Sequence, residues 1–109
     1  MSIKIKFKLD GKNRTFTQQT INARKMRKLF KFYSDMSKVE NGETTKSELD
    51  VLDDMLILVE NFFDDKDVNF DNLLDGLDAT ELMPTLQDVF EQVSRLGQDE
   101  KKIQAVKPV

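Results

Sequence analysis

Three oxygen-bearing side chains at alternate positions form the stretch of this sequence that comes nearest to a ligand site. Asp65, Asp67 and Asn69 fall at the first, third and fifth places of a calcium-binding loop counted from Asp65. Such a loop needs Gly at its sixth place and a bidentate Glu at its twelfth, but Phe70 and Gly76 stand there. Because two defining positions fail, we interpret the stretch as an acidic linker in which Asn69 or Asp67 caps the next helix. We therefore predict no metal and no cofactor. The alternative is a calcium-responsive helix pair at Asp65, which can be tested by whether calcium changes the melting temperature.

The composition argues against catalysis. The chain has no His and no Cys, so the commonest general base, thiolate nucleophiles and disulfides are excluded. Its 20 Asp and Glu residues lie on helix faces or in polar loops, and none forms a recognisable catalytic pair. Gly11 and Gly42 lie outside any Gly-rich phosphate loop. These absences predict a binding or assembly protein and not an enzyme.

Charge is divided unevenly along the chain. Residues 1–46 hold 12 of the 17 basic residues and 4 of the 20 acidic ones, giving +8, whereas residues 47–109 carry −11. The densest basic cluster comprises Arg24, Lys25, Arg27, Lys28 and Lys31. One interpretation is a small nucleic-acid-binding regulator, but the acidic total and the lack of aromatic-interleaved binding motifs argue against it. We favour attraction between the two halves, and predict a charged self-association face at these five residues.

Hydrophobic periodicity places the elements. Apolar residues alternate with lysines over residues 3–9, and Asp10-Gly11 is a hairpin turn leading to a second strand at 12–17. Apolar residues then recur at helical spacing over residues 21–39, 48–63, 70–77 and 78–96, and Ser47 is a predicted cap of the second of these helices. The predicted fold class is α+β, mainly α: an N-terminal β-hairpin packed on a bundle of three to four helices.

The last helix carries its own start and stop signals. Asp78 with Glu81 forms a variant of the capping box, although Pro84 then lies inside the helix. Either the first turn is irregular or regular helix begins nearer Met83. Gly97 is expected to end the helix. We thus predict a single domain at residues 1–97 and a flexible C-terminal tail at 98–109.

Nothing in the sequence indicates export or a membrane span. The N-terminus runs into alternating lysines, and the longest apolar run, residues 55–59, is far shorter than a bilayer requires. A cytoplasmic protein is expected.

Several segments together resemble the G-type tail assembly chaperones of long-tailed phages and prophages of Gram-positive bacteria. The likeness covers about residues 1–97. It rests on the Lys-rich first strand, Ala23-Arg24-Lys25-Met26, the acidic loop followed by Asn69-Phe70-Asp71-Asn72-Leu73-Leu74-Asp75-Gly76-Leu77, and Glu81-Leu82-Met83-Pro84-Thr85-Leu86 with Val89-Phe90.

The resemblance implies a non-enzymatic assembly role. Members of that family coat apolar helical segments of the tape measure protein before the tail tube forms, help recruit major tail protein and self-associate. They often have a frameshifted longer form. Such a protein would act in the cytoplasm of the bacterial host and would not be expected in the mature virion.

Under this hypothesis, six apolar positions are predicted to contact the client or another copy. The alternative is that they are ordinary core, because apolar helix stripes are mainly core. The six residues are Phe62, Phe63, Leu86, Val89, Phe90 and Val93.

Overall fold

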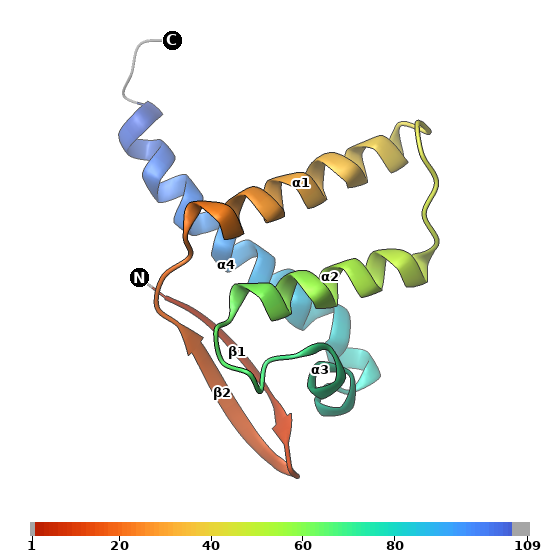
Figure 1. Cartoon of the computed structure of the whole chain (residues 1–109), viewed down its shortest axis with the longest axis vertical. Coiled ribbons are helices and arrows are strands. Elements are labelled where there is room, and N and C mark those ends of the chain that lie inside the picture. Colours follow the sequence, from red (N-terminus) through yellow and green to blue (C-terminus); the bar gives the residue numbers. More distant parts are fainter. Residues whose placement is uncertain (1, 106–109) are drawn as a thin grey trace.

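The computed structural model describes the backbone of residues 2–105 and the side chains of residues 2–96. A two-stranded N-terminal hairpin is followed by four helices (Figure 1). The elements are β1 (Ile3–Leu9), β2 (Lys12–Gln18), α1 (Ala23–Glu40), α2 (Glu48–Phe62), α3 (Phe70–Gly76) and α4 (Ala79–Ala105). The α+β, mainly helical fold predicted from the sequence is confirmed.

The hairpin is amphipathic across its two faces. Its register runs from Leu9 opposite Lys12 to Ile3 opposite Gln18. Both turn residues, Asp10 at φ 54° and Gly11 at φ 79°, have the positive φ of a type I′ turn. The apolar face is buried by the helices through Ile3, Ile5, Phe7 and Phe16, and the lysines of β1 point to solvent.

Three helices begin at the side-chain caps expected from their residue types. Asn22, Ser47 and Asn69 accept hydrogen bonds from the backbone N–H groups three residues on, at 2.9, 3.1 and 2.9 Å. The predicted caps Ser47 and Asn69 are therefore confirmed, and α1 begins at Ala23, two residues later than predicted.

Helix α4 begins where the capping-box variant at Asp78 predicted, but it ends later than predicted. It begins at Ala79, where the Asp78 N–H donates to Glu81 Oε1 at 3.3 Å, and Pro84 lies inside it. The alternative start near Met83 is wrong, since one missing proline N–H near the helix start is tolerated. Gly97 does not end the helix, which continues to Ala105. One internal Gly costs only about 1 kcal/mol, and the Gln, Glu and Lys residues after it favour helix.

The predicted tail at residues 98–109 is thus helical over residues 98–105. Residues 106–109 lie outside the described residues.

The core lies where α2, α3 and α4 cover the hairpin. Helix α2 is central and buries Met55, Leu56, Leu58, Val59 and Phe62. At the edge of β1, the side-chain amide of Gln92 on α4 pairs with the backbone of Lys4: the Lys4 N–H donates to Oε1 and Nε2 donates to the Lys4 carbonyl, both at 2.8 Å. The hairpin is therefore fixed to α4 by both apolar packing and hydrogen bonds.

Candidate partner-binding groove

The six residues predicted to contact a partner all lie in the core. None is more than 5% exposed, because the apolar stripes of α2 and α4 face each other and the hairpin. The exposure that a contact surface requires is absent for Phe62, Phe63, Leu86, Val89, Phe90 and Val93. Their contact with a partner stays a prediction, and it would require the core to open.

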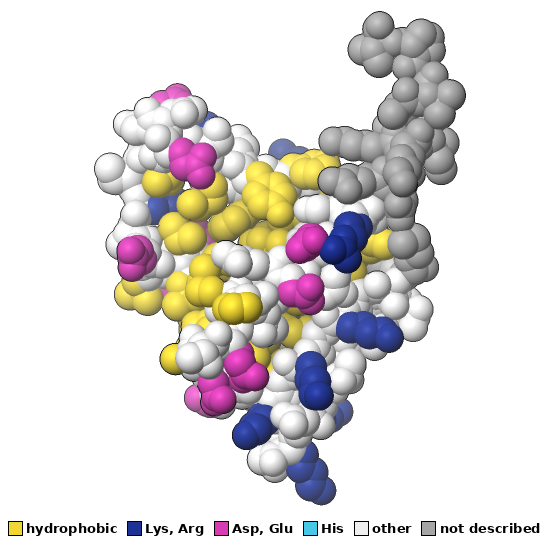
Figure 2. Space-filling model, turned by 180° about the vertical axis from the view of Figure 1, so that it is seen from behind, with side chains coloured by type: hydrophobic (Ala, Val, Ile, Leu, Met, Phe, Trp, Pro, Cys, Tyr) yellow, Lys and Arg dark blue, Asp and Glu magenta, His cyan; other side chains and the backbone are white. Residues whose placement is uncertain are grey.

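An apolar groove lies instead beside this core, between α1, α2 and α4. Its volume is about 490 Å³. Seen from behind, the molecule gathers apolar side chains on this face (Figure 2). The groove is lined by Phe32, Tyr33, Met36, Glu40, Val51, Met55, Met83, Gln87, Phe90, Glu91 and Ser94.

Aromatic packing forms the floor of the apolar groove. The rings of Phe32 and Phe90 meet edge to face with centroids 5.2 Å apart, and Phe90 meets Phe62 of the core at 6.1 Å. The Tyr33 hydroxyl lies 3.3 Å from the Ser94 hydroxyl, which links α1 to α4 along one wall. These contacts make the groove a preformed feature continuous with the core.

The groove is open because α1 packs along only part of its length. Among the described residues of α1, Leu29 alone is fully buried, although the helix is strongly amphipathic. Tyr33 is 44% exposed, and Met83 on the opposite wall is 38% exposed. An amphipathic helix whose apolar stripe remains half-exposed marks a surface where another chain can dock.

The walls combine adaptable apolar side chains with an acidic rim. Met36, Met55 and Met83 line the groove, so it holds three of the chain's five methionines. Thioether side chains repack easily around different partners. Glu40 and Glu91 are exposed lining residues, of which Glu91 pairs with Arg95 on the same helix, and no Lys or Arg is among the lining residues. The arrangement fits an amphipathic helix whose apolar stripe is flanked by basic residues.

A family match supplies the context for this groove. Residues 1–107 match the family described as phage tail chaperone protein. The chain belongs to the phage tail chaperone family. The resemblance noted in the sequence is thereby confirmed, and the role is tail assembly. No curated protein matches the chain. No solved structure matches it either.

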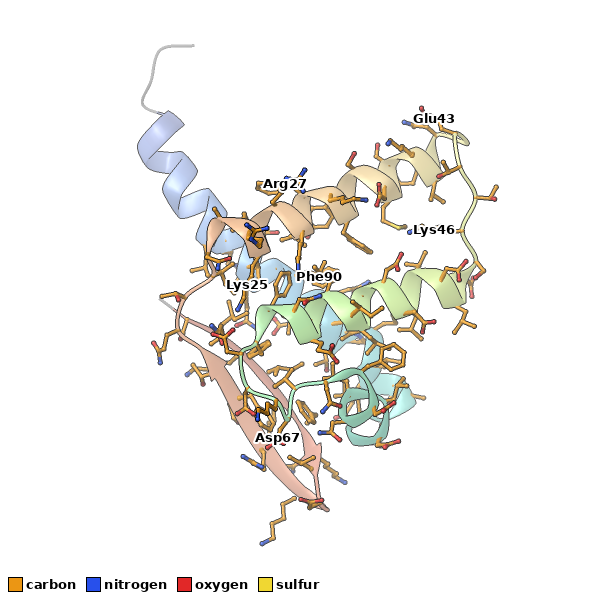
Figure 3. The ribbon with its side chains drawn as sticks, in the orientation of Figure 1. Lys25, Arg27, Glu43, Lys46, Asp67 and Phe90 are labelled. Carbon is orange, nitrogen blue, oxygen red and sulfur yellow. The ribbon has the colours of Figure 1, made fainter. Side chains whose placement is uncertain are left out.

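In this tail chaperone, the predicted basic face on α1 divides into two groups. Lys25 points toward the end of α2, whereas Arg27 points away from the body (Figure 3). The Lys25 ammonium donates to Asp64 at 2.9 Å and to the Phe62 carbonyl at 3.1 Å. Arg24, Arg27 and Lys28 are exposed and lie together, and exposed Lys31 donates to Asp35 at 3.0 Å. Lys25 is therefore a structural tie, and the other four form the available basic surface.

The Lys25–Asp64 contact has an electrostatic consequence. The hydrogen bond from Lys25, followed by that from the Gln18 side chain, lowers the pKa of Asp64. Gln18 also accepts from the Asp64 N–H at 2.9 Å. An acidic group thus offsets the positive charge at the start of α1, where the helix macrodipole disfavours cations.

The acidic linker uses its oxygens internally. Asp65 accepts from the Asp67 N–H at 2.9 Å, Asp67 pairs with Arg14 at 3.5 Å, and Asn69 caps α3. Within the described residues, no group of three potential acidic ligands is arranged to hold a metal ion. None of the helices described there is long and apolar enough to cross a membrane.

The sequence analysis identified some of the lining residues as apolar helix positions, but it did not predict the groove. Tyr33 and Met36 belong to the apolar stripe predicted for the first helix, and Phe90 is one of the six predicted contact positions. Which residues would remain exposed depended on the divergence of α1 from α2, which periodicity does not encode. The concentration of methionines was the one signal pointing to Met36, Met55 and Met83.

Proposed function

We propose that this tail chaperone binds apolar helical segments of the tape measure protein in the apolar groove and keeps them soluble until the tail tube forms. The observation that carries the proposal is the methionine-rich groove on a chain of the tail chaperone family. A long helical client presents apolar stripes that aggregate when uncovered, and a groove between helices is a standard way to cover one.

The expected affinity suits reversible binding. Covering ~600 Å² of apolar surface contributes about 15 kcal/mol gross at ~25 cal/mol/Å². Most of this is offset by lost rotational freedom and side-chain ordering. Several chaperone copies along one client would then bind individually weakly and leave when tube subunits compete.

The proposal also covers the cellular location and the further partners of the protein. We infer that the protein acts without a chemical step in the cytoplasm of the bacterial host and is absent from the mature virion. Further partners under this proposal are the major tail protein, other copies of the chain and a frameshifted longer form. The family match favours this role over the alternative of a nucleic-acid-binding regulator that uses the basic first helix.

A binding assay with matched variants tests the groove. We expect Met36→Glu and Met83→Glu to weaken binding of a labelled tape measure segment at least about tenfold, since each places a carboxylate in an apolar contact. Leu74→Glu changes a residue that is also exposed, at 43%, but lies outside the groove, and it should bind like the parent protein. Thermal melts confirm folding. Equal losses in all three variants, or none, would overturn the groove as the binding site.

A further inference from the structure

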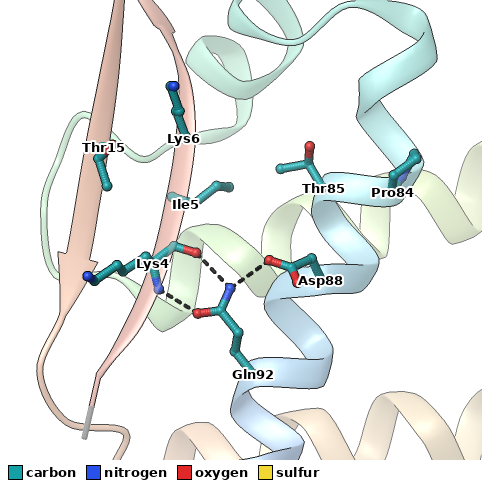
Figure 4. A pocket seen from close by; sticks show the side chains of 8 residues that line it. All are labelled: Lys4, Ile5, Lys6, Thr15, Pro84, Thr85, Asp88 and Gln92. Atoms are coloured by element: carbon teal, nitrogen blue, oxygen red, sulfur yellow. Dashed lines mark hydrogen bonds between the residues drawn. The ribbon is translucent and has the colours of Figure 1, made fainter.

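The rest of the chain covers one outer edge of the hairpin, that of β1, and leaves the other, that of β2, uncovered. At β1, Lys4 is capped by Gln92, which is also held by Asp88 at 2.8 Å (Figure 4). Farther along, α3 ends so close to β1 that a Cβ on Gly76 would lie 2.2 Å from the Lys8 carbonyl oxygen. The outer edge of β1 is therefore covered.

The outer edge of β2 is bare. The bonds to Gln92 show that Lys4 directs its N–H and carbonyl away from β2, so its register partner Thr17 directs its own backbone groups outward as well. By alternation, Asn13 and Thr15 do the same. No described element lies beside this edge, which borders the molecule in Figure 1, and no contact within the described chain satisfies these groups.

The residue types on this edge lack the usual protection. Exposed edges are normally protected by lysine, proline or a bulge. On the face that carries Lys4, Lys6 and Lys8 of the covered strand, the bare strand presents only the uncharged Asn13, Thr15 and Thr17, and its two cations, Lys12 and Arg14, lie on the opposite face. Threonine is a favourable strand residue, so the bare edge is suited to pairing.

We propose that β2 pairs with β2 of a second copy of this chain, which joins the two hairpins into one four-stranded antiparallel sheet. With Thr15 on the two-fold axis, Asn13 lies opposite Thr17 of the other copy, and all outward backbone groups of the strand are satisfied. The two cations of β2 then avoid each other: Lys12 lies opposite Gln18, and Arg14 lies opposite Phe16.

Charge supports this occupant and this register. Arg14 lies over its own Phe16 ring at 4.9 Å, and in this register it faces an uncharged residue of the other copy. If the two-fold axis passed through Arg14 and not Thr15, the two Arg14 side chains would lie opposite each other, which is unfavourable. A two-stranded sheet is also marginal, and two more strands would stabilise it. This inference does not depend on binding of the tape measure protein.

Single-cysteine crosslinking of the full chain tests the pairing, because the chain has no Cys of its own. In the proposed register the two Thr15 Cα atoms lie about 5.5 Å apart, within disulfide range. The two Thr17 residues are offset by four positions, roughly 13 Å. Thr15→Cys should form a disulfide-linked dimer under mild oxidation, and the matched control Thr17→Cys should remain mostly monomeric. Equal crosslinking of both variants would overturn the register.

Sedimentation tests the interaction without oxidation. Thr15→Pro removes an outward N–H but no bond to β1, so the monomer fold should survive and the dimer should dissociate, while Thr15→Val should keep the dimer. The dimer should persist at high salt because backbone hydrogen bonds hold it. A chain that is monomeric at its highest soluble concentration overturns the proposal. A salt-sensitive dimer unaffected by Thr15→Pro also overturns it, and would point to the basic face of α1. Pairing of the edge with a tail protein only, in an otherwise monomeric chain, would contradict it as well.

Discussion

Apolar side chains are completely buried where the helices cover the hairpin, which we call the closed half, and remain partly exposed around α1, which we call the open half. On the hairpin side, Ile3, Leu56 and Leu86 are completely buried. On the side of the groove, the lining residues Tyr33 of α1 and Met83 of α4 remain 44% and 38% exposed. The difference teaches that folding requires only one of the two apolar regions to close, which leaves the other for a partner.

The largest expected loss of stability follows a substitution in the core of the closed half. Leu56→Ala removes a side chain with no exposure from the centre of α2 and should lower the free energy of unfolding by about 2–5 kcal/mol. Met83→Ala in the groove wall should lower it by less than about 1 kcal/mol. Urea denaturation of both variants measures the contrast. Similar losses would show that the groove is part of the folding core.

A smaller effect is expected where α3 meets β1. Gly76→Ala places a methyl group against the Lys8 carbonyl and the Phe7 ring, so one of them must move. We expect a loss of about 1–3 kcal/mol in unfolding free energy, as for other overpacking changes. The exposed neighbour Asp75→Ala serves as the control and should change little. An unaltered melting temperature for Gly76→Ala would refute the tight contact.

A cap in the open half should matter less. Ser47 accepts from the Asp50 N–H at the start of α2, near the tip that joins it to α1. Ser47→Ala should cost about 0.5–1 kcal/mol and raise amide exchange in the first turn of α2, whereas Ser47→Asp should restore both. Exchange that instead rises throughout α2 would mean that the two halves unfold together.

The smallest effect concerns pH and the tie between α1 and the end of α2. Because the pKa of Asp64 is lowered in the folded protein, its ionised form stabilises the fold at pH values above the ordinary aspartate pKa of about 4. This contribution is lost as the pH falls through the lowered pKa. Asp64→Asn should therefore flatten part of the acid limb of the stability–pH curve while leaving other carboxylates, such as Asp35, to titrate. An unchanged acid limb would contradict the assignment.

The sequence predicted the hairpin, the four helices and most of their caps because these depend on local patterns: alternation at residues 3–9, Asp10-Gly11, and Ser47 and Asn69. It missed the length of α4, since a single Gly97 was given more weight than the helix-forming residues around it. The candidate site was only partly predictable. The sequence pattern shows which face of α1 is apolar, but tertiary packing decides how much of that face α2 and α4 cover.

Methyl NMR of the full chain labelled at methionine tests the central claim most directly. Met36, Met55 and Met83 line the groove, whereas Met26 on α1 lies outside its lining. On addition of an apolar tape measure helix, we predict that the three groove signals shift in proportion to binding while that of Met26 stays in place. Saturable binding that leaves the groove methyls unmoved would contradict the account.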